Sequence, residues 1–315
     1  MSGNVIGVLN RARNRNERSS HTNSGSRVTV LECSTARLLV PTASLDRPPT
    51  LVHALDHVQR MRGGSQAHLL RCSDGFYYVV KFQNNPQHIR TLANEALGTL
   101  LAGRLGLPTA HFAIVEVGRE FIRTTEELVV GHGYSLKPCR EGSQFGSRYV
   151  CDPSESQIYN YLPDEVLAGI ENVSDFLGML VFDKWTGNTD NRQAVFYRES
   201  GHTRFRATMI DQGHCFNAEK WDFPDKSFIG IFGQRCVYRS VEGMGSFEHW
   251  LSIVEDQITT SWLHRACEEI PAEWYDHDAG AFSRMVERLD HRRMCVRKLL
   301  EEAKTDCRQP FPNWK

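Results

Sequence analysis

Two aspartates stand on either side of an expected β-hairpin and could together hold a divalent metal ion. Asp190 ends the segment WTGNTD directly before one strand, and Asp211 follows the other strand in MIDQG. Because a hairpin returns the chain to the end where it began, the two carboxylates should meet although they are far apart in sequence. Mg²⁺ prefers hard oxygen ligands and neutralises phosphate charge. Either aspartate alone would more often be a local turn residue, but the pair favours a metal site.

A cation that could bind phosphate lies in the N-terminal half. Lys81 stands near the end of the apolar segment YYVVKF, and Glu95 lies in the next expected helix. Such a glutamate can pair with the lysine and hold its ammonium towards a nucleotide. An exposed strand-edge lysine and a solvated helix glutamate are the alternatives.

A short glycine-bearing loop lies between two expected strands and consists of Gly63, Gly64, Ser65 and Gln66. Glycines permit close backbone approach, and free N–H groups can cradle phosphate. The loop fits neither the P-loop pattern nor the dinucleotide-binding fingerprint, so a plain turn stays open.

Other chemistries have weaker support in the sequence. His53 and His57 are four positions apart but lack the glutamate of a zinc-protease motif. No Gly-x-Ser-x-Gly elbow is present, and no cysteine stands in a recognisable catalytic setting.

The elements that must position these residues change character near residue 150. Before it, the pattern predicts strands, a hairpin around the turn SDG and one helix over 91–105, and the ranges expected as strands are 28–40, 51–58, 67–72, 76–82, 111–117 and 120–122. The stretch 124–146 is polar and glycine-rich.

After residue 150, helical patterns dominate. Asn172 or Ser174 should cap an apolar helix, a hairpin is expected around 199–202, and helical periodicity recurs over 246–304. We therefore expect an α+β fold with two lobes, a small β-rich N-terminal lobe with one helix and a larger helical C-terminal lobe. The expected division is a flexible tail over 1–28, a nucleotide-binding lobe over 29–150, and a lobe over 151–315 with the catalytic and metal loops.

Charge and cysteine usage exclude several classes of protein. The 315 residues carry 37 Lys and Arg against 38 Asp and Glu, which gives no case for a nucleic-acid or membrane-surface protein. Nine cysteines without a Cys-x-x-Cys pair suit reduced thiols in a cytoplasm. No apolar run approaches the roughly 20 residues of a membrane span, and none suits a signal peptide, so we expect a cytoplasmic protein.

The order of these motifs resembles that of the HipA-like kinases, an atypical branch of the protein-kinase-like superfamily. The resemblance covers most of residues 50–300 and rests on the loop at 63–66, Lys81, Glu95, GNTDNRQAVF and MIDQG. It implies a bilobal kinase fold that uses ATP and Mg²⁺ and transfers the γ-phosphate to a serine or threonine of a protein. Because some members are toxins restrained by a DNA-binding antitoxin, it also implies a protein substrate and an antitoxin-like or regulatory protein partner.

The resemblance also implies a role for each motif. Asp190 matches the catalytic-loop aspartate that accepts the substrate proton, and Asp211 matches the metal aspartate of the Asp-x-Gly element. Lys81 and Glu95 match the strand lysine and helix glutamate, and the loop at 63–66 matches the one that covers the phosphates. The hinge that meets adenine would lie near residues 148–152.

The catalytic loop departs from the family pattern at two positions. Arg192 stands where a histidine is usual and is assigned to the catalytic residues with Asp190, and Val195 replaces the asparagine that binds a second metal. Asn191 and Gln193 are the candidate substitutes for that ligand. Met61 and Arg62 stand where some relatives carry an activating serine. An ATP-binding pseudokinase serving as a regulatory or scaffold module, and a small-molecule or lipid kinase, therefore stay open beside a protein kinase.

Overall fold

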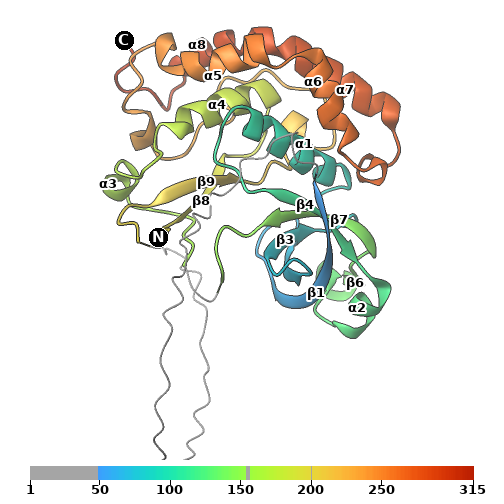
Figure 1. Ribbon diagram of the computed structural model, residues 1–315. Helices are drawn as coiled ribbons and strands as arrows, with labels where there is room; N and C mark the ends of the chain where they lie inside the picture. The colour runs from blue at the N-terminus through green and yellow to red at the C-terminus, as the bar shows by residue number, and fades with distance from the viewer. Residues whose placement is uncertain (1–48, 154–156, 200) are drawn as a thin grey trace, which may run out of the picture. The chain divides into compact units, whose positions relative to one another are not determined.

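The structure is a computed structural model that describes residues 49–153, 157–199 and 201–315 (Figure 1). All described residues belong to one compact unit, which is bounded by residues 41 and 315. The tail expected over 1–28 and the strand expected over 28–40 lie outside the described residues.

Five strands of the described chain close into a barrel in the order β1-β2-β3-β7-β4. They are β1 (Thr50–Arg60), β2 (His68–Cys72), β3 (Tyr77–Lys81), β7 (Gly142–Arg148) and β4 (Phe112–Val117). Neighbours pair antiparallel except β1 and β4, which close the barrel in parallel. Alternating side chains such as Val52, Leu70, Val80 and Val115 fill a buried cluster.

The predicted hairpin around residues 73–75 is confirmed, because β2 pairs with β3 and Gly75 has a φ of 85°. The strand predicted at 120–122 is wrong. This segment is the short helix α2 (Arg119–Thr124), in which Arg123 pairs with Glu120 one turn away. Three residues are too few to separate the period of a strand from that of a helix.

Strand β7 begins in the stretch 124–146, which showed only polar and glycine-rich character, and ends at Arg148. Its sequence, GSQFGSR, has no hydrophobic alternation, yet it joins β3 to β4. A Cβ at Gly146 would lie 2.4 Å from Val115 Cγ2, so the glycine permits the close packing of neighbouring strands. The same stretch holds three short elements, β5 (Val129–Val130), η1 (Gly133–Ser135) and β6 (Lys137–Pro138).

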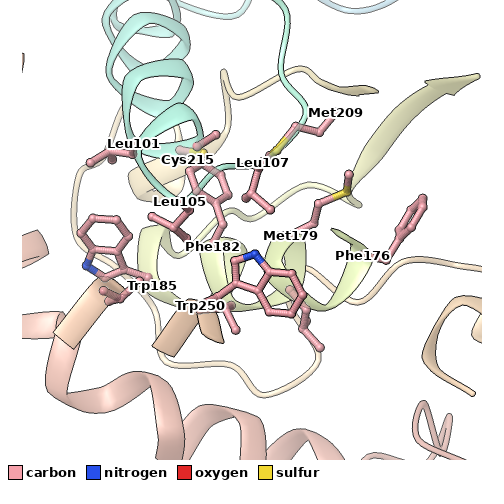
Figure 2. Close-up of a cluster of buried hydrophobic side chains, with 14 of the residues drawn as sticks. Leu101, Leu105, Leu107, Phe176, Met179, Phe182, Trp185, Met209, Cys215 and Trp250 are labelled. Carbon is pink, nitrogen blue, oxygen red and sulfur yellow. The ribbon is translucent and has the colours of Figure 1, made fainter. Parts of the chain in front are cut away.

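Helix α1 (Arg90–Arg104) confirms the helix predicted over 91–105 and is buried along nearly its whole length. It contacts β7 of the barrel and also α4 and α6 of the C-terminal part. Figure 2 shows Leu101, Leu105 and Leu107 of this region among the aromatic side chains of the C-terminal part. Helix α1 therefore belongs to the larger of the two hydrophobic cores.

The remaining elements are mainly helical. Helix α4 (Asp175–Thr186) is the apolar helix predicted near residue 175, and β8 (Gln193–Tyr197) with β9 (Arg206–Ile210) is the predicted hairpin. Ser174 stands at the N-cap of α4 without a capping hydrogen bond, whereas the Asn172 amide bonds Asp175 and β9. The others are α3 (Asp164–Leu167), η2 (Cys215–Asn217), η3 (Arg235–Tyr238), η4 (Met244–Phe247), α5 (Glu248–Ser252), η5 (Ile253–Gln257), α6 (Thr260–Glu268), η6 (Ala272–Tyr275), α7 (Ala279–Arg292), η7 (Arg293–Cys295) and α8 (Val296–Lys304).

The α+β prediction is confirmed, with a β-rich N-terminal part and a helical C-terminal part. Within the described residues, no helix combines the length and the apolar character that crossing a membrane requires.

Candidate active site

Lys81, Glu95 and Asp211 meet between the barrel, helix α1 and the loop after β9. Lys81 Nζ bonds Glu95 Oε1 and lies 2.8 Å from Asp211 Oδ1. The lysine and glutamate side chains are only 8% and 4% exposed, and that of Asp211 is 27% exposed. The predicted Lys81–Glu95 pair is therefore present, and Asp211 completes it from a distant part of the chain.

Their charges depend on one another. Burial by itself would lower the pKa of Lys81, but the Asp211 and Glu95 carboxylates outweigh it and raise that pKa. Burial likewise opposes the ionisation of Asp211, yet Lys81 holds the pKa of this carboxyl below its usual range. Burial raises the pKa of Glu95, against the opposing effect of Lys81. Lys81 thus stays a cation and Asp211 an anion at neutral pH.

Glu95 also fixes the backbone of the loop that carries Asp211. Its two carboxylate oxygens accept hydrogen bonds from Gln212 N and Gly213 N, each at 3.0 Å. A Cβ at Gly213 would lie 2.7 Å from Thr91 Cγ2, so the glycine of MIDQG lets the loop pass close to α1. Asp211 itself has a φ of 61°, a left-handed conformation that needs such support.

Asp190 and Asp211 converge on one side chain, as the hairpin argument predicts. Gln193 begins β8 opposite Ile210 at the end of β9. Its Nε2 lies 3.2 Å from Asp190 Oδ2 and 3.3 Å from Asp211 Oδ2. Both carboxylates are therefore within reach of a single atom between them.

This donor set fits Mg²⁺. Nowhere in the described chain do three or more His, Cys, Asp or Glu side chains form a group able to hold a metal, but Mg²⁺ commonly uses one or two carboxylates together with phosphate oxygens and waters. Asp211 would supply a carboxylate, and the Gln193 amide, which lies between Asp190 and Asp211, can turn its oxygen towards the same place. Asn191 donates its backbone N–H to Asp190 Oδ1 at 2.8 Å, and Asn191 and Gln193 are both exposed. Because the Gln193 side chain contacts both carboxylates, whereas Asn191 contacts Asp190 through its backbone, Gln193 is better placed than Asn191 as a metal ligand.

Arg192 lies in the predicted catalytic loop, but its guanidinium turns into the protein. The side chain is 1% exposed, and it bonds Asp183 of α4 through Nε at 2.9 Å. It also donates to Ile210 O at 3.0 Å and Gln212 Oε1 at 3.3 Å. Arg192 therefore holds the residues on both sides of Asp211 from inside the protein, and the catalytic role predicted for it stays a prediction.

The predicted catalytic loop leaves α4 through a left-handed glycine, Gly187. Asn188 Nδ2 then bonds Asp183 Oδ1 at 2.9 Å, and Asn188 Oδ1 accepts from Asp190 N at 3.2 Å. Sequence reasoning missed Asp183 and Asn188. A carboxylate inside the apolar run FLGMLVFDKW was the signal that could have found the first of them.

The glycine-bearing loop joins the barrel through Gln66. This residue has a φ of 51°, and its Oε1 accepts from Arg60 at 2.6 Å and from Gly131 N at 2.7 Å. Gln66 thus anchors the loop, whereas Gly63, Gly64 and Ser65 form the turn beyond it.

The structure also places Val195 and the segment predicted to be the hinge. Val195 stands within β8 opposite Thr208 and offers no ligand atom from its side chain. Residues 148–152 begin at the last residue of β7 and lead to the helical part, and their contact with adenine stays a prediction.

The α+β fold, with a buried lysine–glutamate pair beside two convergent aspartates, is the arrangement that phosphoryl-transfer enzymes of the kinase type use. A family model described as HipA-like kinase matches residues 56–307, which is most of the chain. The chain belongs to the HipA-like kinase family.

Several solved structures are similar to this chain. The Golgi casein kinase is 10% identical over 84% of this chain and 76% of its own, with a TM-score of 0.45. The Helicobacter pylori proinflammatory kinase CtkA is 13% identical over 81% and 99%, with a TM-score of 0.45. Hydra Fam20, solved with sugar, is 12% identical over 84% and 88%, with a TM-score of 0.44. No curated protein matches the sequence.

Proposed function

We propose that this chain is a kinase that uses ATP and Mg²⁺ and transfers the γ-phosphate to a serine or threonine hydroxyl of a protein. The observation that carries the proposal is the chain of contacts through Asp211. One of its oxygens bonds Lys81 and the other bonds Gln193, which also bonds Asp190. A phosphate-binding cation, a metal carboxylate and a general base thus lie around one space.

Each residue has a distinct part in the proposed reaction. Lys81 binds the α- and β-phosphates of ATP, while Asp211 and Gln193 would hold Mg²⁺, which would neutralise phosphate charge. Asp190 orients the acceptor hydroxyl and takes its proton. The hydroxyl oxygen bonds the γ-phosphorus as the bond to the β,γ-bridging oxygen breaks, and ADP leaves.

Positioning and electrostatics supply most of the acceleration in such a reaction. The surroundings of Lys81, Asp190 and Asp211 suit this role because Glu95, Arg192 and Asn188 restrain them. We assign Arg192 as a positioning residue, and the loop at 63–66 as the cover of the phosphates.

Two alternative functions differ from this proposal, one in the absence of phosphate transfer and the other in the phosphate acceptor. Val195 in place of the metal-binding asparagine favours an ATP-binding pseudokinase, in which nucleotide serves as a structural ligand or switch. A small-molecule or lipid kinase would use the same core with another acceptor. An antitoxin-like or regulatory partner is an expectation of the family resemblance.

The test is transfer from γ-labelled ATP with Mg²⁺ to the protein itself and to a panel of protein, small-molecule and lipid acceptors. We expect label on protein serine or threonine for the wild type. Asp190→Asn should lose transfer by roughly 10²–10⁴-fold and keep its ATP affinity, whereas Asp211→Ala should lose both.

The outcomes separate the readings. A thermal shift with ATP and Mg²⁺ but no transfer to any acceptor selects the pseudokinase. Label on small molecules or lipids alone selects the second alternative. Equal transfer by the wild type and Asp190→Asn contradicts the assigned base, and the absence of any nucleotide-dependent shift contradicts the proposal as a whole.

A further inference from the structure

Gln87 is held at a defined place in the segment between β3 and α1. The Asn85 side chain, 6% exposed, accepts hydrogen bonds from Gln87 N at 2.9 Å and His88 N at 3.3 Å. The same amide donates to Phe82 O at 2.9 Å and to His88 O at 3.2 Å. This turn connects the strand of Lys81 to the helix of Glu95. Gln87 therefore lies in the segment that joins the two residues of the ion pair.

The Gln87 side chain lies between the glycine-bearing loop and the metal loop. A Cβ at Gly64 would lie 2.9 Å from Gln87 Nε2, and that nitrogen is 3.1 Å from His214 Nε2. His214 follows Asp211 by three positions, and its carbonyl accepts from Thr189 N at 3.2 Å, next to Asp190. The Gln87 amide therefore adjoins the glycine-bearing loop and the loop after Asp211, which in turn bonds the segment before Asp190.

The other atom of this amide has no partner. Gln87 Oε1 is buried and makes no hydrogen bond, and among the described residues the same holds only for Asp290 Oδ1, which has an ion pair with Arg293. A buried polar atom without a partner is costly. Such an atom beside a binding site indicates a position that a ligand satisfies.

A glutamine amide can turn by 180° and exchange its two ends. The oxygen then accepts a hydrogen bond from His214 Nε2–H, and the NH₂ group takes the unpartnered position as a donor. An anionic oxygen there favours this orientation, since hydrogen bonds to charged groups are stronger than those between neutral groups.

We propose that Gln87 is a phosphate-binding residue, whose amide N–H donates to the terminal phosphates of the nucleotide beneath Gly64. His214 is the positioning residue that sets the orientation of the amide. This inference rests on the proposed nucleotide site and adds to it a residue that discriminates ligands by the number of phosphates.

The experiment compares the affinities of the full chain for AMP and for a non-hydrolysable ATP analogue, both with Mg²⁺, by calorimetry. Gln87→Leu keeps the size of the side chain and removes its polar atoms. We expect it to weaken binding of the ATP analogue by roughly tenfold, which is the loss of one hydrogen bond to a charged group. Binding of AMP should stay as in the wild type.

Gln257→Leu is the matched control, because Gln257 is exposed at the end of η5, and it should change neither affinity. Gln87→Glu is the second variant and should weaken the ATP analogue more than Gln87→Leu, because it adds a negative charge. Unchanged analogue affinity in both Gln87 variants, or an equal loss for AMP and analogue, overturns the inference alone. A wild type that binds neither ligand overturns the proposed function.

Discussion

At the scale of single residues, the site depends on side chains that contact two loops at once. Gln193 contacts both aspartates, Glu95 bonds Lys81 and the backbone after Asp211, and Arg192 bonds Asp183 and both neighbours of Asp211. Each of these side chains acts by holding a second group in place. Substitutions should therefore separate effects on geometry from effects on chemistry.

Gln193 should govern the metal dependence of transfer. Gln193→Leu removes the amide between the carboxylates, so we expect the Mg²⁺ concentration for half-maximal transfer to rise roughly tenfold, in the range seen when support of a metal site is lost. Asn191→Leu is the matched variant and should leave the Mg²⁺ dependence unchanged. The reverse result, with Asn191→Leu impaired and Gln193→Leu normal, would show that the ligand assignment is wrong.

Arg192 should act on stability as well as on turnover. Arg192→Leu leaves the buried Asp183 carboxylate without its cation, which typically costs about 3–5 kcal/mol of unfolding free energy. The double variant Asp183→Leu with Arg192→Leu should recover part of that loss, since no unpaired charge is then buried. Urea unfolding of the three proteins measures this. Wild-type stability in Arg192→Leu with a loss of turnover alone would instead support direct participation in the chemistry.

At the scale of elements, residues 219–228, which follow the loop of Asp211, are held by arginines from three parts of the chain. Arg90 of α1 bonds Glu219 O at 2.7 Å, Arg288 of α7 bonds Trp221 O at 3.0 Å, and Arg308 near the C-terminus bonds Phe228 O at 2.7 Å. Trp221 has a φ of 55° and Phe223 one of 50°. Such left-handed conformations at large residues persist where the surroundings enforce them.

Lys184 of α4 contributes to this arrangement and should make stability depend on pH. Its Nζ bonds Ser227 O and lies 2.6 Å from Ile229 O. Burial lowers the pKa of Lys184 from 10.5 to about 7, Asp183 and Asp306 raise it, and Arg308 and Arg292 lower it further. The unfolded chain therefore binds the proton more tightly than the folded chain between these two values.

Unfolding free energy should accordingly rise with pH above about 7, by at most about 1.4 kcal/mol per pH unit from this group. Lys184→Met keeps the aliphatic stem and removes the titrating amine, so the difference in slope between the two proteins isolates Lys184. Urea unfolding between about pH 6.5 and 9 measures the slopes, because this range starts just below the pKa of Lys184 in the folded chain. Identical slopes would contradict a titration of Lys184 in this range.

At the scale of the whole molecule, the described residues belong to one compact unit. The larger core joins Leu97 and Leu101 of α1 to Phe182 and Trp185 of α4. The barrel has its own smaller core. Secondary structure thus changes from mainly strands to mainly helices near residue 150, but α1 packs against helices beyond that point.

A fragment of residues 49–153 should therefore fail to fold alone, because it would expose the face of α1 that the C-terminal helices cover. The 49–315 chain should unfold in a single transition. Near-ultraviolet circular dichroism and urea unfolding of both would test this. A cooperative transition in the fragment would establish an independent N-terminal domain.

Local signals sufficed for much of the prediction. Hydrophobic periodicity located α1, α4 and the strands β2, β3, β8 and β9, and the hairpin predicted that Asp190 and Asp211 converge. Strand β7 escaped because it carries no alternating pattern, and α2 was mistaken for a strand because its apolar run is too short to define a period.

The sequence alone determined which residues could do chemistry, since residue type and position beside turns are local properties. Only the tertiary structure decided where each side chain points: Arg192 into the protein, Gln193 between the carboxylates, and Gln87 under Gly64. The physical reason is that partners such as Asp183, Glu95 and His214 reach these groups through long-range packing, which no local pattern encodes.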